Sequence, residues 1–169
     1  MTPVTPYNDS RPKSEQVEQM FDSIAPAYDL MNTAMTFGLH NVWRSKALKA
    51  AAKALETANK ADSAPDGSVA APLRILDIAT GTGDVAFELH RRHPGAEIIG
   101  VDLSEGMLDV ARRKLADADE QSRRKIHFEQ GDSLALRFGD AEFDMITVAY
   151  GVRNFQQLDR GLAEMRRVL

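Results

Sequence analysis

The segment Asp-Ile-Ala-Thr-Gly-Thr-Gly-Asp at residues 77–84 decides the fold. An apolar run from Leu73 to Ile78 leads into it, and a helical pattern from Asp84 to Arg92 follows it. A turn with two glycines between a strand and a helix is the place where many α/β proteins bind nucleotide-like ligands. The segment therefore predicts a strand, a ligand-binding turn and a helix.

Beyond this segment, short β-type runs alternate with helical runs. The expected strands are 73–78, 97–101, 126–129 and 143–149. The expected helices are 84–92, 105–118 and one that begins near Gln156, with Leu158, Leu162, Met165 and Leu169 on one face. Such alternation is typical of an α/β protein with a mostly parallel, doubly wound, Rossmann-like sheet.

The residues before this core divide into three segments. Residues 1–13 hold three prolines, and we expect a flexible tail. Residues 14–57 are expected to be helical, in two stretches, and residues 58–72 form a linker to a cofactor-binding core at 73–169. The first helix should place Val17, Met20, Phe21 and Ile24 on one face. The second should turn toward the sheet the side that contains Trp43, Ala47, Ala50, Ala51, Ala54 and Leu55.

Composition narrows the classes of function. The 169 residues fit one domain, and the absence of cysteine together with four scattered histidines gives no metal site. A net charge of −4 gives no basic footprint, so nucleic acid is not an expected partner. No apolar run approaches the roughly 20 residues of a membrane-spanning helix, and the first residues do not look like a signal peptide. We therefore expect a cytoplasmic protein.

The glycine turn carries a G-x-G-x-x-A pattern that indicates a ribose-containing cofactor. Gly81 permits a sharp turn, Gly83 permits close approach of a ligand to the backbone, and Asp102 follows Gly83 by nineteen residues at the end of the next strand. That carboxylate can accept hydrogen bonds from a ribose diol. A plain tight turn is the structural alternative, but the combined strand, helix and acid spacing favours cofactor binding.

Two carboxylates flank the turn and bear on which cofactor binds. Asp77 ends the strand and Asp84 begins the helix. Negative charge here would repel a pyrophosphate and favour a cationic sulfonium, so S-adenosylmethionine is expected rather than a dinucleotide. Asp84 has an equally good structural role as an acid in the first turn of a helix. An NAD-dependent oxidoreductase is accordingly disfavoured.

A further polar pair follows the third expected strand. Asp132 offers a carboxylate and Ser133 a backbone N–H, which together suit the amino group and ring nitrogen of adenine. An Asx turn is the simpler interpretation of the same residues. Their position at the carboxyl end of a strand, where open α/β sheets bind ligands, favours cofactor binding.

Two blocks outside the turn resemble the C-methyltransferase family of ubiquinone and menaquinone biosynthesis. The first comprises 20–25, 28–32, 36–38, His40 and Trp43; the second comprises 150–155, and the ending 165–169 is also similar. The resemblance covers nearly everything after residue 13 except 58–72. It implies a class I methyltransferase fold, S-adenosylmethionine as cofactor and a cofactor contact at Thr82.

The resemblance also implies methyl transfer to a ring carbon of a polyprenylated 1,4-naphthoquinol, or of a benzoquinol. Such a substrate resides in membrane, so transient contact with the inner membrane surface is expected. The apolar face of the first helix then has two interpretations. Core packing is favoured, and a lid over the lipid-tailed substrate is the alternative.

Four residues are candidates for the catalytic work, which is to remove a proton from the quinol hydroxyl. His40 is a candidate base because the ordinary pKa of a histidine lies near neutrality, and Tyr28, or Asp29 beside it, is a candidate from the same block. Arg153 could hold the developing phenolate charge, and Asn154 could orient the quinol oxygen. Three of them have a structural alternative: packing for the histidine, an ion pair for the arginine, and an aromatic cover over the cofactor for the tyrosine.

Two departures from the family pattern matter. Thr36 replaces the usual serine and keeps the hydroxyl, whereas the family continues beyond Leu169 into three more strands. Without those C-terminal strands, the fourth strand would be an apolar edge. We therefore expect either a fragment or a homodimer. A non-catalytic cofactor-binding fragment and a methyltransferase of another small molecule stay open as alternatives.

Overall fold

The computed structural model describes residues 6–7, 10–36, 39, 42–51 and 72–169. In this part of the chain, a parallel four-stranded sheet has the order β3-β2-β1-β4. The strands are β1 (Arg74–Ile78), β2 (Glu97–Asp102), β3 (Ile126–Gln130) and β4 (Met145–Val148). The predicted parallel α/β sheet is confirmed, although β4 is shorter than the expected 143–149.

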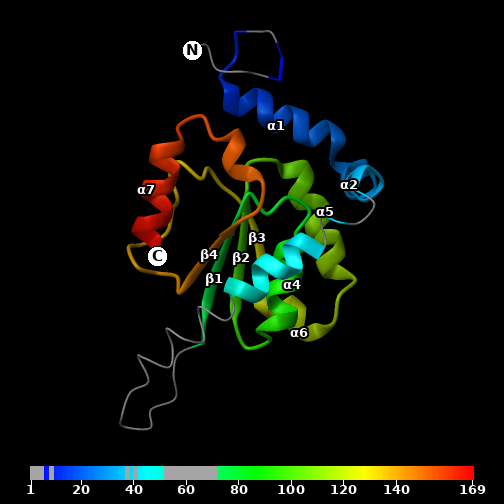
Figure 1. Cartoon of the computed structure of the whole chain (residues 1–169), viewed down its shortest axis with the longest axis vertical. Helices are drawn as coiled ribbons and strands as arrows, with labels where there is room; N and C mark the ends of the chain where they lie inside the picture. The colour runs from blue at the N-terminus through cyan, green and yellow to red at the C-terminus, as the bar shows by residue number, and fades with distance from the viewer. Residues whose placement is uncertain (1–5, 8–9, 37–38, 40–41, 52–71) are drawn as a thin grey trace.

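Helices cover both faces of the sheet, as Figure 1 shows. α4 (Asp84–Arg92) follows β1, α5 (Glu105–Ala116) and α6 (Glu120–Lys125) follow β2, and α7 (Leu158–Val168) follows β4. α7 lies on one side of the sheet, whereas α4 and α5 lie on the other. The sheet is therefore doubly wound, as predicted.

Alternate residues of each strand enter different cores. Ile75 and Ile98 pack with Leu89 of α4 on one face, while Leu76 and Ile99 pack with residues of α7 on the other. Because both faces are covered, the central strands β1 and β2 are buried along most of their length, which is usual for parallel sheets. This arrangement leaves the carboxyl ends of the strands as the place for a ligand.

The N-terminal helices pack across that carboxyl end. α1 (Lys13–Ile24) runs through the short helical turn η1 (Ala25–Ala27) into α2 (Tyr28–Thr36), and residues 42–51 are also helical. α2 was not predicted as a separate helix, and none of its residues is buried. No helix in the described segments is both long and apolar enough to cross a bilayer.

The orientation of the helix at 42–51 differs from the prediction. Trp43 was expected to face the sheet but is 58% exposed, and Leu48 packs into the core instead. Arg44 and Ser45 fix this orientation, since Arg44 pairs with Asp84 and Ser45 accepts hydrogen bonds from Arg92. The expected inward positions Ala54 and Leu55, and all of 58–71, lie outside the described residues.

Two further expectations need correction. In α7 the buried residues are Gly161, Met165 and Val168, while Leu158 and Leu162 are exposed, because Phe155 packs closely on Gly161. The tail is also not free where it is described. The buried Gln16 of α1 accepts a hydrogen bond from the backbone N–H of Tyr7 and donates one to the carbonyl oxygen of Arg11.

Candidate functional site

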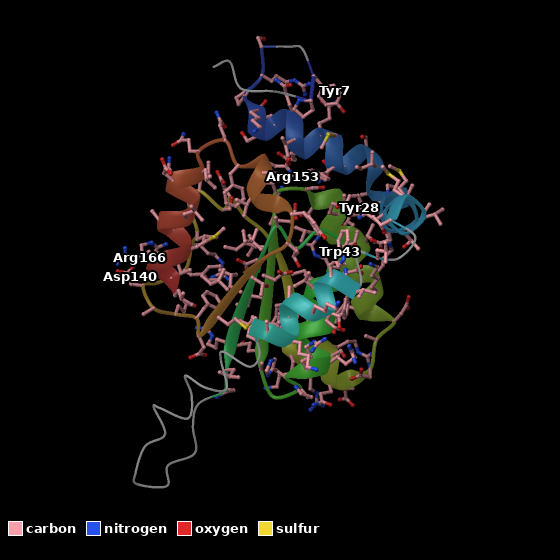
Figure 2. The ribbon with its side chains drawn as sticks, in the orientation of Figure 1. Tyr7, Tyr28, Trp43, Asp140, Arg153 and Arg166 are labelled. Atoms are coloured by element: carbon pink, nitrogen blue, oxygen red, sulfur yellow. The ribbon has the colours of Figure 1, made fainter. Side chains whose placement is uncertain are left out.

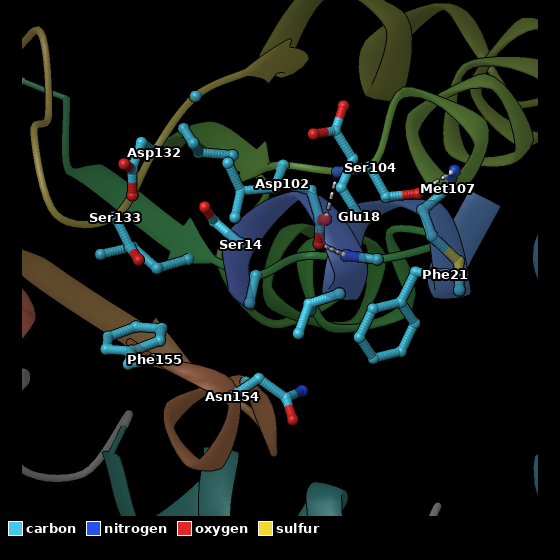
Figure 3. Close-up of a pocket in the computed structure, with 18 of the residues that line it drawn as sticks. Ser14, Glu18, Phe21, Asp102, Ser104, Met107, Asp132, Ser133, Asn154 and Phe155 are labelled. Carbon is cyan, nitrogen blue, oxygen red and sulfur yellow. Dashed lines mark hydrogen bonds between the residues drawn. The ribbon is translucent and has the colours of Figure 1, made fainter. Parts of the chain in front are cut away.

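A cavity opens at the carboxyl ends of all four strands, beneath α1 and the start of α2 (Figure 3). With the open space at its mouth it measures about 910 Å³. Its floor is formed by the segments that follow the strands: 78–81, 101–104, 131–134 and 149–156. Its cover is formed by Ser14, Val17, Glu18, Phe21 and Tyr28.

Asp102 lies at the centre of the floor, at the end of β2. Its two carboxylate oxygens accept hydrogen bonds from the backbone N–H groups of Gly81, at 2.8 Å, and Ser104, at 2.9 Å. Burial raises the pKa of Asp102, and these backbone hydrogen bonds oppose the rise only in part. Each oxygen keeps a further lone pair, so the carboxylate can also accept from a ribose diol. The predicted ribose contact therefore has a fixed and accessible acceptor.

Asp132 and Ser133 also line the cavity, from the loop after β3. Asp132 accepts a hydrogen bond from the backbone N–H of Leu134 at 2.8 Å, so the loop contains the Asx turn that was weighed against cofactor binding. The geometry is compatible with both the Asx turn and cofactor binding, because the turn itself places Asp132 and Ser133 at the edge of the cavity. Their contact with adenine stays a prediction.

Glu18 is a cavity residue that the sequence analysis missed. It lies on α1 beside Asp102 in Figure 3, and burial and the nearby Asp22 and Glu15 raise its pKa. Its helix was interpreted chiefly as core packing, yet Val17 and Phe21 of the same face line the cavity as well. Val17 is also buried in the core, so α1 both packs and covers the cavity, and its role as a lid over a lipid-tailed substrate stays a prediction.

Three of the four catalytic candidates border this cavity. Tyr28 lies in the cover, where its ring meets that of Phe21 edge-on at 6.1 Å, and Arg153 and Asn154 lie in the short helical turn η2 (Gly151–Asn154) after β4. Figure 2 shows Arg153 and Tyr28 beneath α1 at the same end of the molecule. His40 lies outside the described residues.

Arg153 is free to meet a ligand. It is exposed at the rim of the cavity, and no carboxylate in the described segments forms an ion pair with it. The structural alternative considered from the sequence, an ion pair, is therefore not found among these residues. The backbone just before the turn that contains Arg153 is strained, because Tyr150 has a φ of 64°. The next residue, Gly151, packs so closely on Ala79 that a Cβ on Gly151 would lie 2.3 Å from the Cβ of Ala79. Strain of this kind gathers at functional sites.

Asp77 and Asp84 were expected to present negative charge to the cofactor, but neither lines the cavity. Asp77 is buried and does not line the cavity; its carboxylate accepts hydrogen bonds from the hydroxyls of Thr80 and Thr147. Asp84 pairs with Arg44 and Lys114, both at 2.9 Å. Neither carboxylate therefore presents free negative charge to a ligand.

The negative charge of the site comes from other side chains. Glu18, Asp102 and Asp132 line the cavity, and Arg153 at the rim is the cation among its lining residues. Three carboxylates against one guanidinium favour a ligand with positive charge. The preference for a cationic cofactor is thus supported by Glu18, Asp102 and Asp132 rather than by the two aspartates of the turn.

Thr82 and Gly83 also take different positions from those expected. The Thr82 hydroxyl donates to Asp29 of α2 at 2.6 Å and does not reach the cavity. Gly83 has a φ of 84° and a Cβ there would lie 2.7 Å from the ring of Phe128, so this glycine serves close packing. Of the turn, Gly81 is the residue that lines the cavity.

The chain is similar to known proteins in both sequence and fold. The chain is 44% identical over 167 residues to a demethylmenaquinone methyltransferase of Bacteroides fragilis and 46% identical over 164 residues to one of Deinococcus radiodurans. These matches cover 98% and 97% of this chain, but the chain spans only 60% of the length of each relative.

Among solved structures, the cyclase SpnF superposes with a TM-score of 0.63 at 21% identity, over 96% of this chain and 58% of that chain. A fold shared with a cyclase does not by itself specify methyl transfer. The sequence relationship is more specific, because residues 9–169 match one family throughout. The chain belongs to the ubiE/COQ5 methyltransferase family.

Proposed function

We propose that this chain is the cofactor-binding part of an S-adenosylmethionine-dependent C-methyltransferase that converts a polyprenylated demethylmenaquinol to menaquinol. The observation that carries the proposal is the cavity itself. The carboxylates of Glu18, Asp102 and Asp132 line it, and the exposed Arg153 lies at its rim. The relatives named as demethylmenaquinone methyltransferases favour a naphthoquinol over a benzoquinol.

The described residues fit the cofactor. Asp102 would hold the ribose hydroxyls, Asp132 and the N–H of Ser133 the adenine edge, and Gly81 would let the backbone approach the methionine portion. Glu18 adds negative charge opposite a cationic ligand. When bound, the cofactor supplies an electrophilic methyl group.

The chain's own residues would act on the quinol. Loss of the proton from the ring hydroxyl places negative charge on the oxygen and on the neighbouring carbon, which then accepts the methyl and loses its own proton. Arg153 can stabilise the phenolate because a guanidinium stays protonated, and Asn154 can orient the oxygen. Tyr28 at the cover is the described candidate for proton transfer, and the cover excludes water from the reacting atoms.

Contact with a membrane surface forms part of the proposal, since a polyprenyl tail is confined to lipid. α2 and the helix at 42–51 support it. Leu30 is 74%, Met35 78% and Trp43 58% exposed, and Lys46 and Lys49 are exposed on the same outward side as Trp43. Apolar side chains with tryptophan and lysine suit the boundary of an anionic bilayer.

A second candidate is a cofactor-binding fragment without activity, which the 60% coverage of the relatives favours. β4 forms one edge of the described sheet, so pairing of two copies at that edge is a further proposal. The two functional candidates differ in whether they transfer a methyl group.

One experiment separates these candidates. The chain is incubated with methyl-labelled S-adenosylmethionine and a short-chain demethylmenaquinol, with the matching benzoquinol in parallel, and binding is measured by calorimetry. Label in the naphthoquinol supports the enzyme. Binding without transfer supports the fragment, and no binding by folded protein contradicts both. Cosedimentation with anionic and neutral vesicles, for the chain and for Trp43→Ser, tests the membrane contact.

A further inference from the structure

Hydrogen bonds and ion pairs join the helices of the cover to the loops that form the floor. On α2, Asp29 accepts the Thr82 hydroxyl at 2.6 Å and pairs with Lys114 at 2.5 Å. Lys114 also holds Asp84 at 2.9 Å. The glycine turn and α5 are thus both attached to the first turn of α2, immediately beside Tyr28.

A second attachment joins α1 to the loop after β2. Asp22 accepts the Ser104 hydroxyl at 2.6 Å and the backbone N–H of Gly106 at 2.9 Å. Asp22 therefore caps α5 from a different helix, together with Ser104, which accepts from the Met107 N–H. The packing is tight, because a Cβ on Gly106 would lie 3.1 Å from the Asp22 backbone.

Asp102 connects these two attachments. One of its oxygens is bound to Gly81, the neighbour of Thr82, and the other to Ser104, the partner of Asp22. Movement of either loop would therefore shift the carboxylate that faces the cavity. Asp22, Asp29 and Thr82 are not among the residues that line the cavity, so none of them would contact a ligand there directly. The charge of Asp22 also acts on Glu18 and Asp102, whereas Asp29 and Thr82 act through the hydrogen-bonded connection.

We propose that Asp22 and Asp29 are positioning residues that hold α1 and α2 closed over the cavity, so that cofactor binding and closure of this cover stabilise one another. The inference rests on the proposed function, since it takes the cofactor to occupy the cavity at Asp102. A ligand that fixes Asp102 fixes both loops, and the loops in turn hold the cover. Conversely, a loosened cover lowers the population of the binding-competent site and weakens apparent affinity in proportion.

The central test is a double-mutant cycle on Asp29 and Thr82, with S-adenosylhomocysteine affinity measured by calorimetry. Asp29→Ala and Thr82→Val should each weaken binding about tenfold, the ratio that corresponds to one hydrogen bond to a charged group. The double variant should be no weaker than Asp29→Ala, because that change already removes the hydrogen bond from Thr82 together with the ion pair to Lys114. Thr82→Ser, which keeps the hydroxyl, should restore the affinity.

Matched controls separate positioning from general damage. Thr33→Val removes a hydroxyl from the same helix that bonds only to the helix's own backbone, at the carbonyl oxygen of Asp29, and should leave affinity unchanged. Asp22→Ala should weaken binding, whereas Ser23→Ala, which removes an exposed hydroxyl that donates to the carbonyl oxygen of Met20 in the same α1, should not. Circular dichroism confirms that each variant is folded before its affinity is compared.

A second readout follows the cover directly. Chymotrypsin can cleave after the exposed Leu30 once α2 opens, and S-adenosylhomocysteine at saturation should slow this cleavage in the parent chain. Each variant is compared at a ligand concentration that saturates it. Asp29→Ala should then lose most of the protection from cleavage, and Thr33→Val should keep it.

The outcomes distinguish the two proposals. If the folded parent chain does not bind S-adenosylhomocysteine, the proposed function fails and this inference with it. If the parent binds but folded Asp29→Ala and Asp22→Ala bind equally well, the positioning role alone is overturned. Loss of affinity in Thr82→Val but not in Asp29→Ala also overturns it, since Thr82 would then act on the cofactor directly.

Discussion

The Thr147 hydroxyl on β4 donates a 2.7 Å hydrogen bond to the carboxylate of Asp77 on the neighbouring β1, while Thr80 donates to the other oxygen at 2.6 Å. Asp77 is thereby held inside the sheet rather than at the cavity. Burial outweighs these two hydrogen bonds and raises the pKa of Asp77 from 3.8 to about 6. A buried acid at the centre of the sheet therefore makes stability depend on pH.

The sign of that dependence follows from the two pKa values of Asp77. Between about pH 4 and pH 6 the folded protein keeps a proton that the unfolded chain has released, so this group's contribution to stability falls as pH rises. At about 1.4 kcal/mol per pKa unit, ionising Asp77 in the folded state costs about 3 kcal/mol. Asp77→Asn should remove this trend in urea unfolding measured from pH 4 to pH 7.5. An unchanged pH slope in the variant would contradict the assignment.

Cofactor affinity should also depend on pH. The pKa of Asp102 is raised by burial and that of Glu18 by burial and neighbouring acids, and both must ionise to attract a cationic ligand. Affinity for S-adenosylmethionine should therefore increase as pH rises through these raised pKa values and then level off. Calorimetry across pH 4.5 to 8 measures it, with Asp102→Asn as the variant in which the dependence shrinks. A flat profile in the parent chain would count against this charge arrangement.

Gly81 and Gly83 form a matched pair that separates backbone strain from packing. Both have positive φ, 59° and 84°, but only at Gly83 would a Cβ meet Phe128, at 2.7 Å. Gly81→Ala should destabilise by about 1 kcal/mol through the left-handed backbone alone. Gly83→Ala should cost roughly 2 to 4 kcal/mol because overpacking is added. Urea unfolding of the two variants gives the comparison, and equal losses would refute the packing role of Gly83.

Arg153 should matter for transfer and not for the cofactor. Its guanidinium is exposed at the cavity rim, where the developing phenolate would lie. In a chain that shows transfer, Arg153→Ala should lower the methyl-transfer rate about 100-fold while S-adenosylhomocysteine affinity stays within a factor of about two. Arg153→Lys should recover part of the rate. A proportional loss of cofactor affinity in Arg153→Ala would place the residue at the cofactor instead.

Local pattern was enough to predict the fold. β1 to β3 and α4 have nearly the predicted bounds, because their apolar residues follow the strand and helix periods and Gly and Pro mark their ends. α6 and α2 were missed for the opposite reason. α6 has no apolar period and begins at the cap Asp119, and α2 buries none of its residues.

The candidate site was predictable where a residue's position follows from its strand. Asp102 and Asp132 come directly after β2 and β3, so parallel topology places both at the carboxyl edge. Glu18 and the partner of Thr82 could not be found in this way, because they depend on how α1 and α2 pack against loops more than fifty residues away. The signal for Glu18 was its position three residues before Phe21, which places the two side chains close together on the surface of α1.

The most direct measurement is a crystal structure of the chain with S-adenosylhomocysteine. We expect the ribose hydroxyls to contact Asp102, the adenine to lie beside Asp132 and Ser133, and α1 and α2 to be closed over the ligand. Density for the ligand outside this cavity, or a ribose that makes no contact with Asp102, would contradict this expectation.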